Sequence, residues 1–214
     1  MQSRYLPTPC LCLVTDRRLC GGVDMLEKKV ISALSGGVDM VQIREKDLPS
    51  DEFMQLASRL RSATGGKALL VINDRADVTM AIEADGLHLP ENSISVCDAK
   101  IRMPTQILIS KAVHDTDGAF LAAREGAEFL ILGTIFPTAS KPGINTGGVN
   151  LISAVTHHVD IPVLAIGGID SSNAASVIVA GASGVAVITA ILGAPNAEKA
   201  AQDLKRSMEI TWEG

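Results

Sequence analysis

Two cations and an amide alternate in the segment QIREKD at residues 42–47. The segment continues a short apolar run, and alternation along an extended backbone places Gln42, Arg44 and Lys46 on one side. Guanidinium and ammonium groups that converge in this way bind anions, and we expect phosphate or pyrophosphate here. The competing interpretation is a solvated run of charges in a loop, which the position at a strand end disfavours.

A carboxylate beside an amide follows the next apolar run, at Asn73-Asp74. This pair predicts a Mg²⁺ site, because Mg²⁺ needs few protein ligands when phosphates supply the rest. Either residue could instead be the N-cap of the following helix. The pair by itself does not decide between the two interpretations.

A long loop follows the run FLILG and extends over residues 133–143, with Thr138, Ser140 and Lys141 in its second half. Its length is unusual for a connection from a strand to a helix, and such loops often close over an anionic ligand. Hydroxyls and a lysine repeat the anion-binding chemistry of residues 42–46. The alternative is a mobile surface loop.

Glycines and a hydroxyl follow the last two apolar runs, at Gly167-Gly168 and at Ile188-Thr189. Glycine lets the backbone approach an anion, and a helix capped by Ser171 or Ser172 would offer free N–H groups to it. A tight turn would need the same glycines. The glycines can serve in a tight turn and in an anion site at once, and we expect a phosphate site here.

Four histidines remain, and they divide into two pairs. His88 and His114 lie at or just past apolar runs, so either can enter a site, although a structural role is the simpler expectation. His157 and His158 are adjacent in a helical segment and are expected to face solvent. The chain shows no Ser/His/Asp or Cys/His arrangement, which argues against acyl-transfer chemistry.

Eight short apolar runs position these residues. Each is rich in leucine or β-branched residues and most lead into a polar loop, which is typical of buried parallel strands. The runs are CLCLV (10–14), MVQI (40–43), ALLVI (68–72), GLHL (86–89), QILIS (106–110), FLILG (129–133), PVLAI (162–166) and GVAVI (184–188).

Helical patterns lie between the runs, at Met25–Leu34, Asn173–Ala180 and Ala197–Met208, and Ser50 caps another. A Gly-Ala pair ends a helical pattern just before the next strand at residues 126–127 and 181–182. Eight strand–helix units favour a closed barrel over an open doubly wound sheet. We therefore predict an α/β protein with a single (β/α)8 TIM-barrel domain over residues 1–214 and a core over about 10–208.

Composition limits the partners. The formal net charge is −5, which argues against nucleic acid, so an anionic ligand must be held by a local cluster of cations. Small phosphorylated molecules are the expected partners. Oligomeric state is not readable, although a homodimer would be unsurprising.

The cysteines and the apolar runs indicate the cellular compartment that we expect for the protein. The spacing of the four cysteines contains no C-x-x-C, so we expect reduced thiols in a cytoplasmic protein. No run of about 18 apolar residues predicts a membrane span, and the first residues do not have the pattern of a signal peptide.

Taken together, the motifs resemble the thiamine phosphate synthase superfamily from about Leu11 to Met208. The resemblance is carried by VQIREKD, INDRADV, ADGLHLP, LGTIFPTASKPG, PVLAIGGI and GASGVAVITAI, in that order along the chain. It implies a synthase that joins hydroxymethylpyrimidine diphosphate to thiazole phosphate. Pyrophosphate leaves first, the pyrimidine methylene carries positive charge, and the thiazole nitrogen then attacks.

The resemblance also implies roles for individual residues. Gln42, Arg44, Lys46 and Asn73 contact the pyrimidine diphosphate, while Asp74 binds Mg²⁺. Arg44, Lys46 and Lys141 stabilise the leaving charge. The remaining contacts that the resemblance implies are Thr138, Ser140, Gly168, Ile188 and Thr189. His114 is added to the substrate contacts from its place just past the fifth apolar run.

Three positions depart from the family patterns. Ser93 stands where the synthase has a second metal-binding aspartate, and Glu91 is the candidate to replace it. Ala112 replaces a serine of the synthase. These losses and the form HLP lean towards the related thiazole tautomerase, but Thr134 replaces the histidine that the tautomerase uses for proton transfer. Synthase, tautomerase and a non-catalytic regulator that binds thiazole phosphate therefore remain open, with synthase preferred.

Overall fold

Eight parallel strands close into a barrel in chain order, which confirms the predicted (β/α)8 fold. The computed structural model describes residues 6–138, 143 and 145–212. Each strand pairs in parallel with its neighbours in the chain, and β8 pairs with β1 to complete the ring. The strands are β1 (Cys10–Val14), β2 (Met40–Ile43), β3 (Leu69–Asn73), β4 (Gly86–Leu89), β5 (Leu108–Val113), β6 (Phe129–Gly133), β7 (Val163–Ile166) and β8 (Gly184–Val187).

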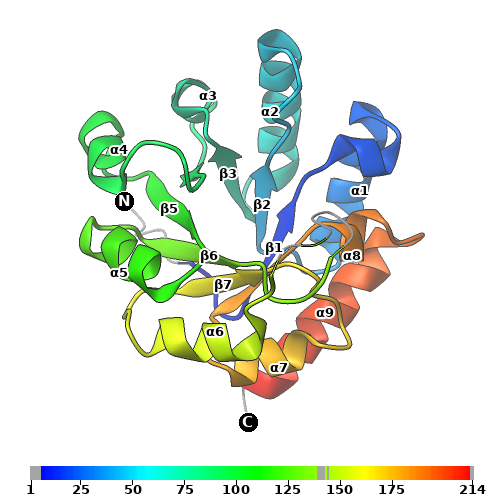
Figure 1. Cartoon of the computed structure of the whole chain (residues 1–214). Helices are drawn as coiled ribbons and strands as arrows, with labels where there is room; N and C mark the ends of the chain where they lie inside the picture. Colours follow the sequence, from blue (N-terminus) through cyan, green and yellow to red (C-terminus); the bar gives the residue numbers. More distant parts are fainter. Residues whose placement is uncertain (1–5, 139–142, 144, 213–214) are drawn as a thin grey trace.

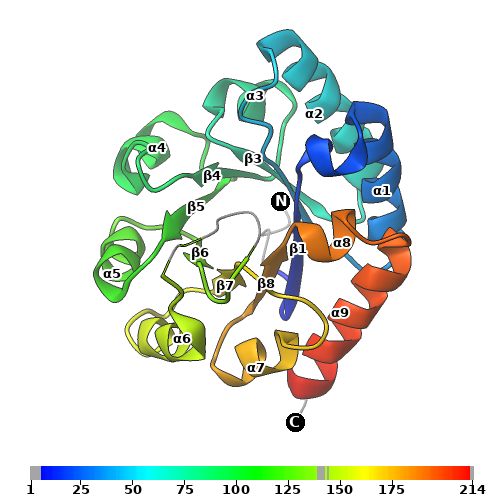
Figure 2. The same ribbon diagram turned by 45° about the vertical axis from the view of Figure 1, so that its right-hand side comes forward.

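Helices surround the barrel, and Figures 1 and 2 show them as an outer ring. The long α9 packs between α1 and α7, so the last helix of the chain lies beside the first α-helix (Figure 2). The helices are η1 (Arg17–Cys20), α1 (Val23–Ser35), α2 (Ser50–Thr64), α3 (Ala76–Ala81), α4 (Val96–Arg102), α5 (Thr116–Arg124), α6 (Gly148–Thr156), α7 (Ala174–Val179), α8 (Thr189–Leu192) and α9 (Ala197–Trp212).

Three expected boundaries were wrong. β5 runs later than the apolar run QILIS and includes Lys111, a charged residue that hydropathy alone excludes from a buried strand. Ser50 is the first residue of α2 and not its cap, because Pro49 occupies the cap position without a side-chain hydrogen bond. Neither Ser171 nor Ser172 caps α7, since Asn173 precedes that helix and Ser172 bonds to Asp170 instead.

The Gly-Ala punctuation between helix and strand is confirmed. Gly126 after α5 and Gly181 after α7 have φ values of +91° and +101°, a left-handed conformation in which a side chain would be strained. Among the described residues, no helix combines the length and the apolar character that a bilayer crossing requires.

The barrel interior changes character along its axis. Near the amino ends of the strands it is filled by an apolar cluster that includes Cys10, Met40 and Phe129. Nearer the carboxyl ends of the strands, the buried residues include Gln42, Asn73, His88 and Ser110. A second and larger apolar core lies between the strands and the helices. Buried polar side chains are costly without partners, so their concentration at the carboxyl end marks that end for binding.

Candidate active site

A cavity of about 670 Å³ opens at the carboxyl ends of the strands. Most of its lining comes from the end of β2 and the loop after it, the loops after β3 and β4, and the end of β5, and β1, β6, β7 and the end of β8 add one residue each. The sequence-predicted residues that line it come from five strands or the loops after them: Gln42, Arg44, Lys46, Asn73, Asp74, Glu91, His114 and Ile188. The fold therefore brings the predicted anion-binding, metal-binding and pyrimidine-binding positions to one hollow.

A smaller hollow of about 80 Å³ lies between the ends of β6, β7 and β8 and shares Ile166 and Ile188 with the large cavity. Its lining includes the predicted residues Thr138, Gly168 and Thr189. Both cavities include the ends of β7 and β8, where barrels often bind phosphate. The two other predicted residues of the long loop, Ser140 and Lys141, lie outside the described residues.

Gly168 permits close packing beside this smaller hollow. A Cβ atom at Gly168 would lie 2.5 Å from the carbonyl oxygen of Pro137, and the backbone there has a φ of +63°. Any side chain would displace the loop after β6 and strain its own backbone. The glycine is therefore required for this loop to lie against the end of β7.

The floor of the large cavity carries neutral hydrogen-bonding groups. The side-chain amide of Gln42 donates to the Asn73 side chain at 3.4 Å, and both residues are nearly fully buried. Within the described part of the chain, Gln42 Oε1 is a buried oxygen without a hydrogen-bond partner. An unsatisfied buried acceptor is costly, so a ligand that donates a hydrogen bond there would gain binding energy.

His88 belongs to the same floor. Its Nδ1 lies 2.9 Å from the hydroxyl of Ser110, and the ring lines the cavity. Burial, with further contributions from the cations Arg44 and Lys111, lowers the pKa of His88 to about 3. The imidazole is therefore neutral near pH 7. The sequence left open whether His88 has a structural role or enters the site. The ring does both, because it contacts Ser110 and lines the cavity.

Asp74 forms the acidic wall of the cavity with Ser93 and Glu91. Ser93 donates its hydroxyl proton to Asp74 Oδ1 at 2.8 Å, and the Asp74 backbone N–H donates to the carbonyl of His88 at 2.9 Å. The helix-capping interpretation of Asn73 and Asp74 is wrong, because α3 begins at Ala76 after an Arg75 that makes no side-chain cap. Asp74 has a φ of +64°, so it turns the chain at the end of β3.

His114 and Glu91 face one another across this wall. His114 Nε2 lies 3.4 Å from Glu91 Oε2, and the other ring nitrogen contacts the carbonyl of Gly133. The pair connects the loop after β4 to the end of β6. Glu91 is therefore engaged with His114 in this arrangement and is more than half exposed.

The donor atoms of the acidic wall match a weakly held Mg²⁺. Asp74 supplies one carboxylate, and Ser93 and Asn92 place further oxygen-bearing side chains on the cavity. Over the residues that the structure describes, no three His, Cys, Asp or Glu side chains are grouped to hold a metal. Such a set suits a cation that is bound chiefly by water and substrate phosphates, as Mg²⁺ often is.

Arg75 is a cavity residue that the sequence pattern did not single out. Its guanidinium binds Asp77 with two hydrogen bonds of 3.0 and 2.9 Å and lies over the ring of Phe53 at 5.5 Å. Its place directly after Asn73-Asp74 at a strand end was an available signal. Arg44, Lys46 and Arg75 thus give the described cavity lining three cations.

Comparison with known proteins agrees with this arrangement. The family model for thiamine monophosphate synthase matches residues 11–191. The chain belongs to the thiamine monophosphate synthase family. A putative thiamine-phosphate synthase of Geobacter sulfurreducens is 40% identical over 91% of this chain and 92% of its own length. The thiamine-phosphate synthase of Moorella thermoacetica is 38% identical over 94% and 96% of the two chains.

A solved structure carries the same resemblance in three dimensions. The thiamine phosphate pyrophosphorylase from Pyrococcus furiosus superposes with a TM-score of 0.86 at 34% identity, over 94% of this chain and 96% of that one. Membership of the synthase family makes this chain a transferase of thiamine biosynthesis. The isomerase alternative is not favoured, because the close relatives in sequence and structure are named as synthases or pyrophosphorylases.

Proposed function

We propose that this family member couples hydroxymethylpyrimidine diphosphate to thiazole phosphate in the large cavity and releases pyrophosphate. The observation that supports the proposal most directly is the convergence of Arg44, Lys46 and Asp74 on one hollow with an uncharged floor. Cations beside a carboxylate suit a diphosphate with a bound cation, and the neutral floor suits a heteroaromatic ring.

In the proposed reaction, the bond between the pyrimidine methylene carbon and the diphosphate oxygen breaks first. The electron pair leaves with pyrophosphate, and the lone pair of the thiazole nitrogen then forms the new carbon–nitrogen bond. Arg44 and Lys46 stabilise the charge that develops on the leaving group, as preorganised cations do in a site shielded from water. Lys141 is assigned the same role from its sequence position.

The floor is assigned to the pyrimidine ring. Gln42 and Asn73 offer amide groups, and the unpartnered Gln42 oxygen would accept a hydrogen bond from the ring's amino group. His88 is held neutral by burial. A protonated imidazole at this position would repel the positive charge that forms on the methylene carbon, so the depressed pKa of His88 suits the proposed intermediate.

The smaller hollow is assigned to the phosphate of the thiazole substrate. Gly168, Ile188 and Thr189 line it together with Thr138, and Ser140 and Lys141 are added from their sequence positions. The short α8 begins at Thr189, so backbone N–H groups without partners in the helix lie at the same edge. His114 is kept as a further substrate contact.

Mg²⁺ is proposed as the cofactor. Asp74 would hold it, with Glu91 as the second candidate if it parts from His114. When bound, the cation would neutralise part of the diphosphate charge. The oxygen donors of the acidic wall support this assignment, and Ser93 would orient Asp74 through its hydrogen bond.

The wider predictions accompany this proposal. Small phosphorylated molecules are the proposed partners, while the homodimer, the absence of nucleic acid and membrane partners, and the single-domain organisation stay predictions. We also propose a cytoplasmic location, which the four free cysteines support.

The test is to incubate the purified protein with both substrates, with and without Mg²⁺, and to measure thiamine phosphate. We expect product only with Mg²⁺. Arg44→Ala and Lys141→Ala should each lower turnover at least about tenfold, because a charge-assisted contact to a leaving group commonly exceeds about 1.4 kcal/mol. Arg102→Ala and Lys67→Ala are matched controls, since both side chains are exposed and neither lines the cavity.

The opposite results are equally informative. Wild-type turnover in both Arg44→Ala and Lys141→Ala would refute the anion site. Isomerisation of the thiazole substrate without Mg²⁺ would identify a tautomerase. Binding of thiazole phosphate by calorimetry, with no product under any condition, would identify a regulator.

A further inference from the structure

Arg17 lies at the start of η1, in the loop after β1, and faces the loop after β2. That loop alternates in charge: Arg44, Glu45 and Lys46 all line the cavity, and Asp47 follows them in the chain. Arg17 contacts both carboxylates. It is 28 residues from Glu45 in the chain, so only the closed barrel brings the two together.

The contacts of Arg17 form a clamp across the two loops. Its backbone N–H donates to Glu45 Oε1 at 3.0 Å, and its Nη1 donates to Glu45 Oε2 at 3.0 Å. Its two terminal nitrogens also donate to the two oxygens of Asp47, each at 2.9 Å. A planar guanidinium suits this paired geometry, which a lysine cannot reproduce.

Thr15 joins the same two loops directly beside the clamp. Its hydroxyl accepts the backbone N–H of Arg44 at 3.0 Å, and its own N–H donates to the carbonyl of Gln42 at 2.9 Å. Thr15 is fully buried. The segment that carries Arg44 and Lys46 is therefore held from the β1 side through its backbone at positions 42 and 44 and through its side chains at positions 45 and 47.

The clamp also controls charge next to the cavity. The side chain of Glu45 is only 2% exposed, so its carboxylate needs a buried counter-charge. The pKa of Arg17 is raised by its hydrogen bond to Asp47, the largest cause, and by its hydrogen bond to Glu45. The same contact with Arg17 lowers the pKa of Asp47 to about 2. Without Arg17, Glu45 and Asp47 would lack their own counter-charge and would compete with the anionic ligand for Arg44 and Lys46.

We propose that Arg17 is a positioning residue for the diphosphate subsite: it holds the loop after β2 in register and neutralises Glu45 and Asp47, so that Arg44 and Lys46 act on the ligand. This inference rests on the proposed function, because it assigns the diphosphate to Arg44 and Lys46. It predicts a selective effect on one substrate, whereas a general loss of structure would affect both.

The experiment measures the binding of inorganic pyrophosphate by calorimetry in excess Mg²⁺, and KM for each substrate separately. Arg17→Met should raise the pyrophosphate Kd and the KM for the pyrimidine diphosphate at least about tenfold, a loss of one bidentate charged contact. The KM for thiazole phosphate should stay within about twofold. Arg18→Met is the matched control, since the Arg18 side chain is 69% exposed and forms its ion pair with Asp16.

Two further variants separate charge from geometry. Glu45→Gln added to Arg17→Met removes the unpaired buried carboxylate, so the double variant should recover part of the lost affinity. Arg17→Lys keeps the charge without the forked geometry and should give an intermediate Kd, about threefold above wild type. Arg17→Lys also tests the clamp if Arg17→Met does not fold.

The outcomes distinguish this inference from the proposed function. If Arg44→Ala weakens pyrophosphate binding and folded Arg17→Met or Arg17→Lys does not, the clamp is refuted and the proposed function stands. If Arg44→Ala also leaves pyrophosphate binding unchanged, the assignment of the diphosphate subsite is itself refuted. An equal rise in KM for both substrates would show a general structural role and would also overturn the inference.

Discussion

The two walls of the cavity are braced by different kinds of interaction. The wall after β2 carries Arg44 and Lys46 and is fixed by ion pairs from Arg17. The wall after β3 and β4 carries Asp74 and is fixed mainly by single hydrogen bonds to neutral groups, such as the one from Ser93. A cationic wall needs its own carboxylates neutralised, whereas a carboxylate that is to bind the proposed Mg²⁺ must keep most of its lone pairs free for the cation.

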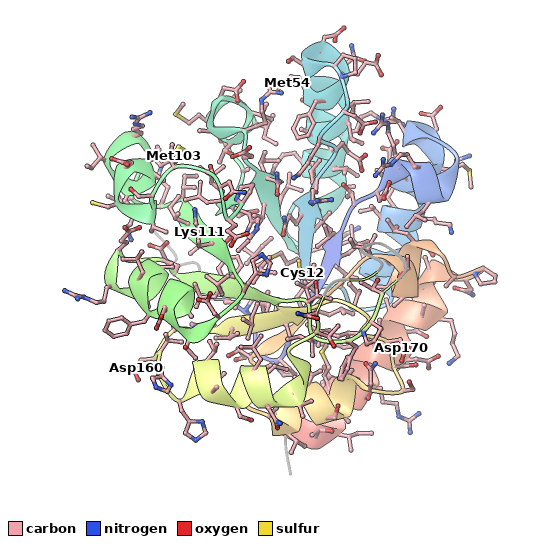
Figure 3. The ribbon with its side chains drawn as sticks, viewed as in Figure 1. Cys12, Met54, Met103, Lys111, Asp160 and Asp170 are labelled. Carbon is pink, nitrogen blue, oxygen red and sulfur yellow. The ribbon has the colours of Figure 1, made fainter. Side chains whose placement is uncertain are left out.

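The acidic wall has a support of its own, and it comes from the β5 side. Lys111 on β5 donates to the carbonyl of Ile94 at 3.2 Å, and Glu125 accepts the backbone N–H of Val96 at 2.9 Å. Figure 3 shows Lys111 beside the loop that leads to α4. These contacts hold the loop that carries Glu91 and Ser93 from behind and leave the cavity side of Asp74 open.

The largest expected difference between the two walls is the loss of Mg²⁺ affinity when the Asp74 charge is removed. Asp74→Asn should weaken Mg²⁺ binding by about 100-fold or more, since changes even beyond the direct ligands often cost 10- to 100-fold. Mn²⁺ titration followed by electron paramagnetic resonance measures this without turnover. Asp160→Asn is the control, because Asp160 is exposed and precedes β7 at the opposite end of the barrel. An unchanged Mn²⁺ affinity in Asp74→Asn would remove the metal from this wall.

The neutral floor between the walls predicts a pH effect on stability. The pKa of His88 is about 3 in the folded chain, against an ordinary histidine value of 6.5, so the unfolded chain binds the extra proton between these limits. The stability that depends on neutral His88 is therefore complete above pH 6.5 and is lost as the pH falls towards 3. The loss is at most about 1.4 kcal/mol per pH unit, or about 2 kcal/mol between about pH 6.5 and about pH 5.

Denaturant unfolding at several pH values measures this slope. His88→Gln cannot take up the proton, so its free energy of unfolding should fall less steeply with acid than that of the wild type. Equal slopes in the two proteins would show that the floor does not hold a neutral histidine.

A smaller effect is expected from the hydrogen bond within the acidic wall. Ser93→Ala removes the donor that orients Asp74 and should weaken Mn²⁺ binding about tenfold. Ser93→Thr keeps the hydroxyl and should retain most of the affinity. If Ser93→Ala binds Mn²⁺ as the wild type does, the orientation of Asp74 does not depend on Ser93.

The smallest expected effect concerns the support behind the acidic wall. Lys111→Met keeps the apolar stem and removes the bond to Ile94, so the Mg²⁺ concentration for half-maximal activity should rise about threefold. The KM for thiazole phosphate should not change, which separates this wall from the smaller hollow. A larger effect on thiazole phosphate than on Mg²⁺ would contradict this division of the cavity.

The repeating pattern of the sequence predicted most of the architecture. Each of the eight apolar runs coincides with or overlaps a strand, because buried parallel strands need continuous apolar stretches whatever their neighbours are. The β5 boundary failed at Lys111, since hydropathy cannot show that a lysine will find a carbonyl partner behind the sheet. Ser50 failed as a cap because Pro49 takes that position.

Much of the candidate site was also readable. Alternation alone placed Gln42, Arg44 and Lys46 on one side of the strand end, and all three line the cavity, but so does Glu45 between them, because β2 ends at Ile43. The sequence could not choose between a metal ligand and a helix cap for Asp74, because that choice depends on where α3 begins. Arg75 was missed, although its place at a strand end carried the same signal as Arg44.

The sequence by itself determined the order of the strands, the residues at their ends and the chemistry available there, because these follow from local periodicity and residue type. Only the tertiary structure decided which distant groups meet: Arg17 with Glu45, Ser93 with Asp74, and His88 with Ser110. Each pair joins neighbouring strands or the loops after them. Closure of the barrel sets these distances, and no pattern within a single segment encodes them.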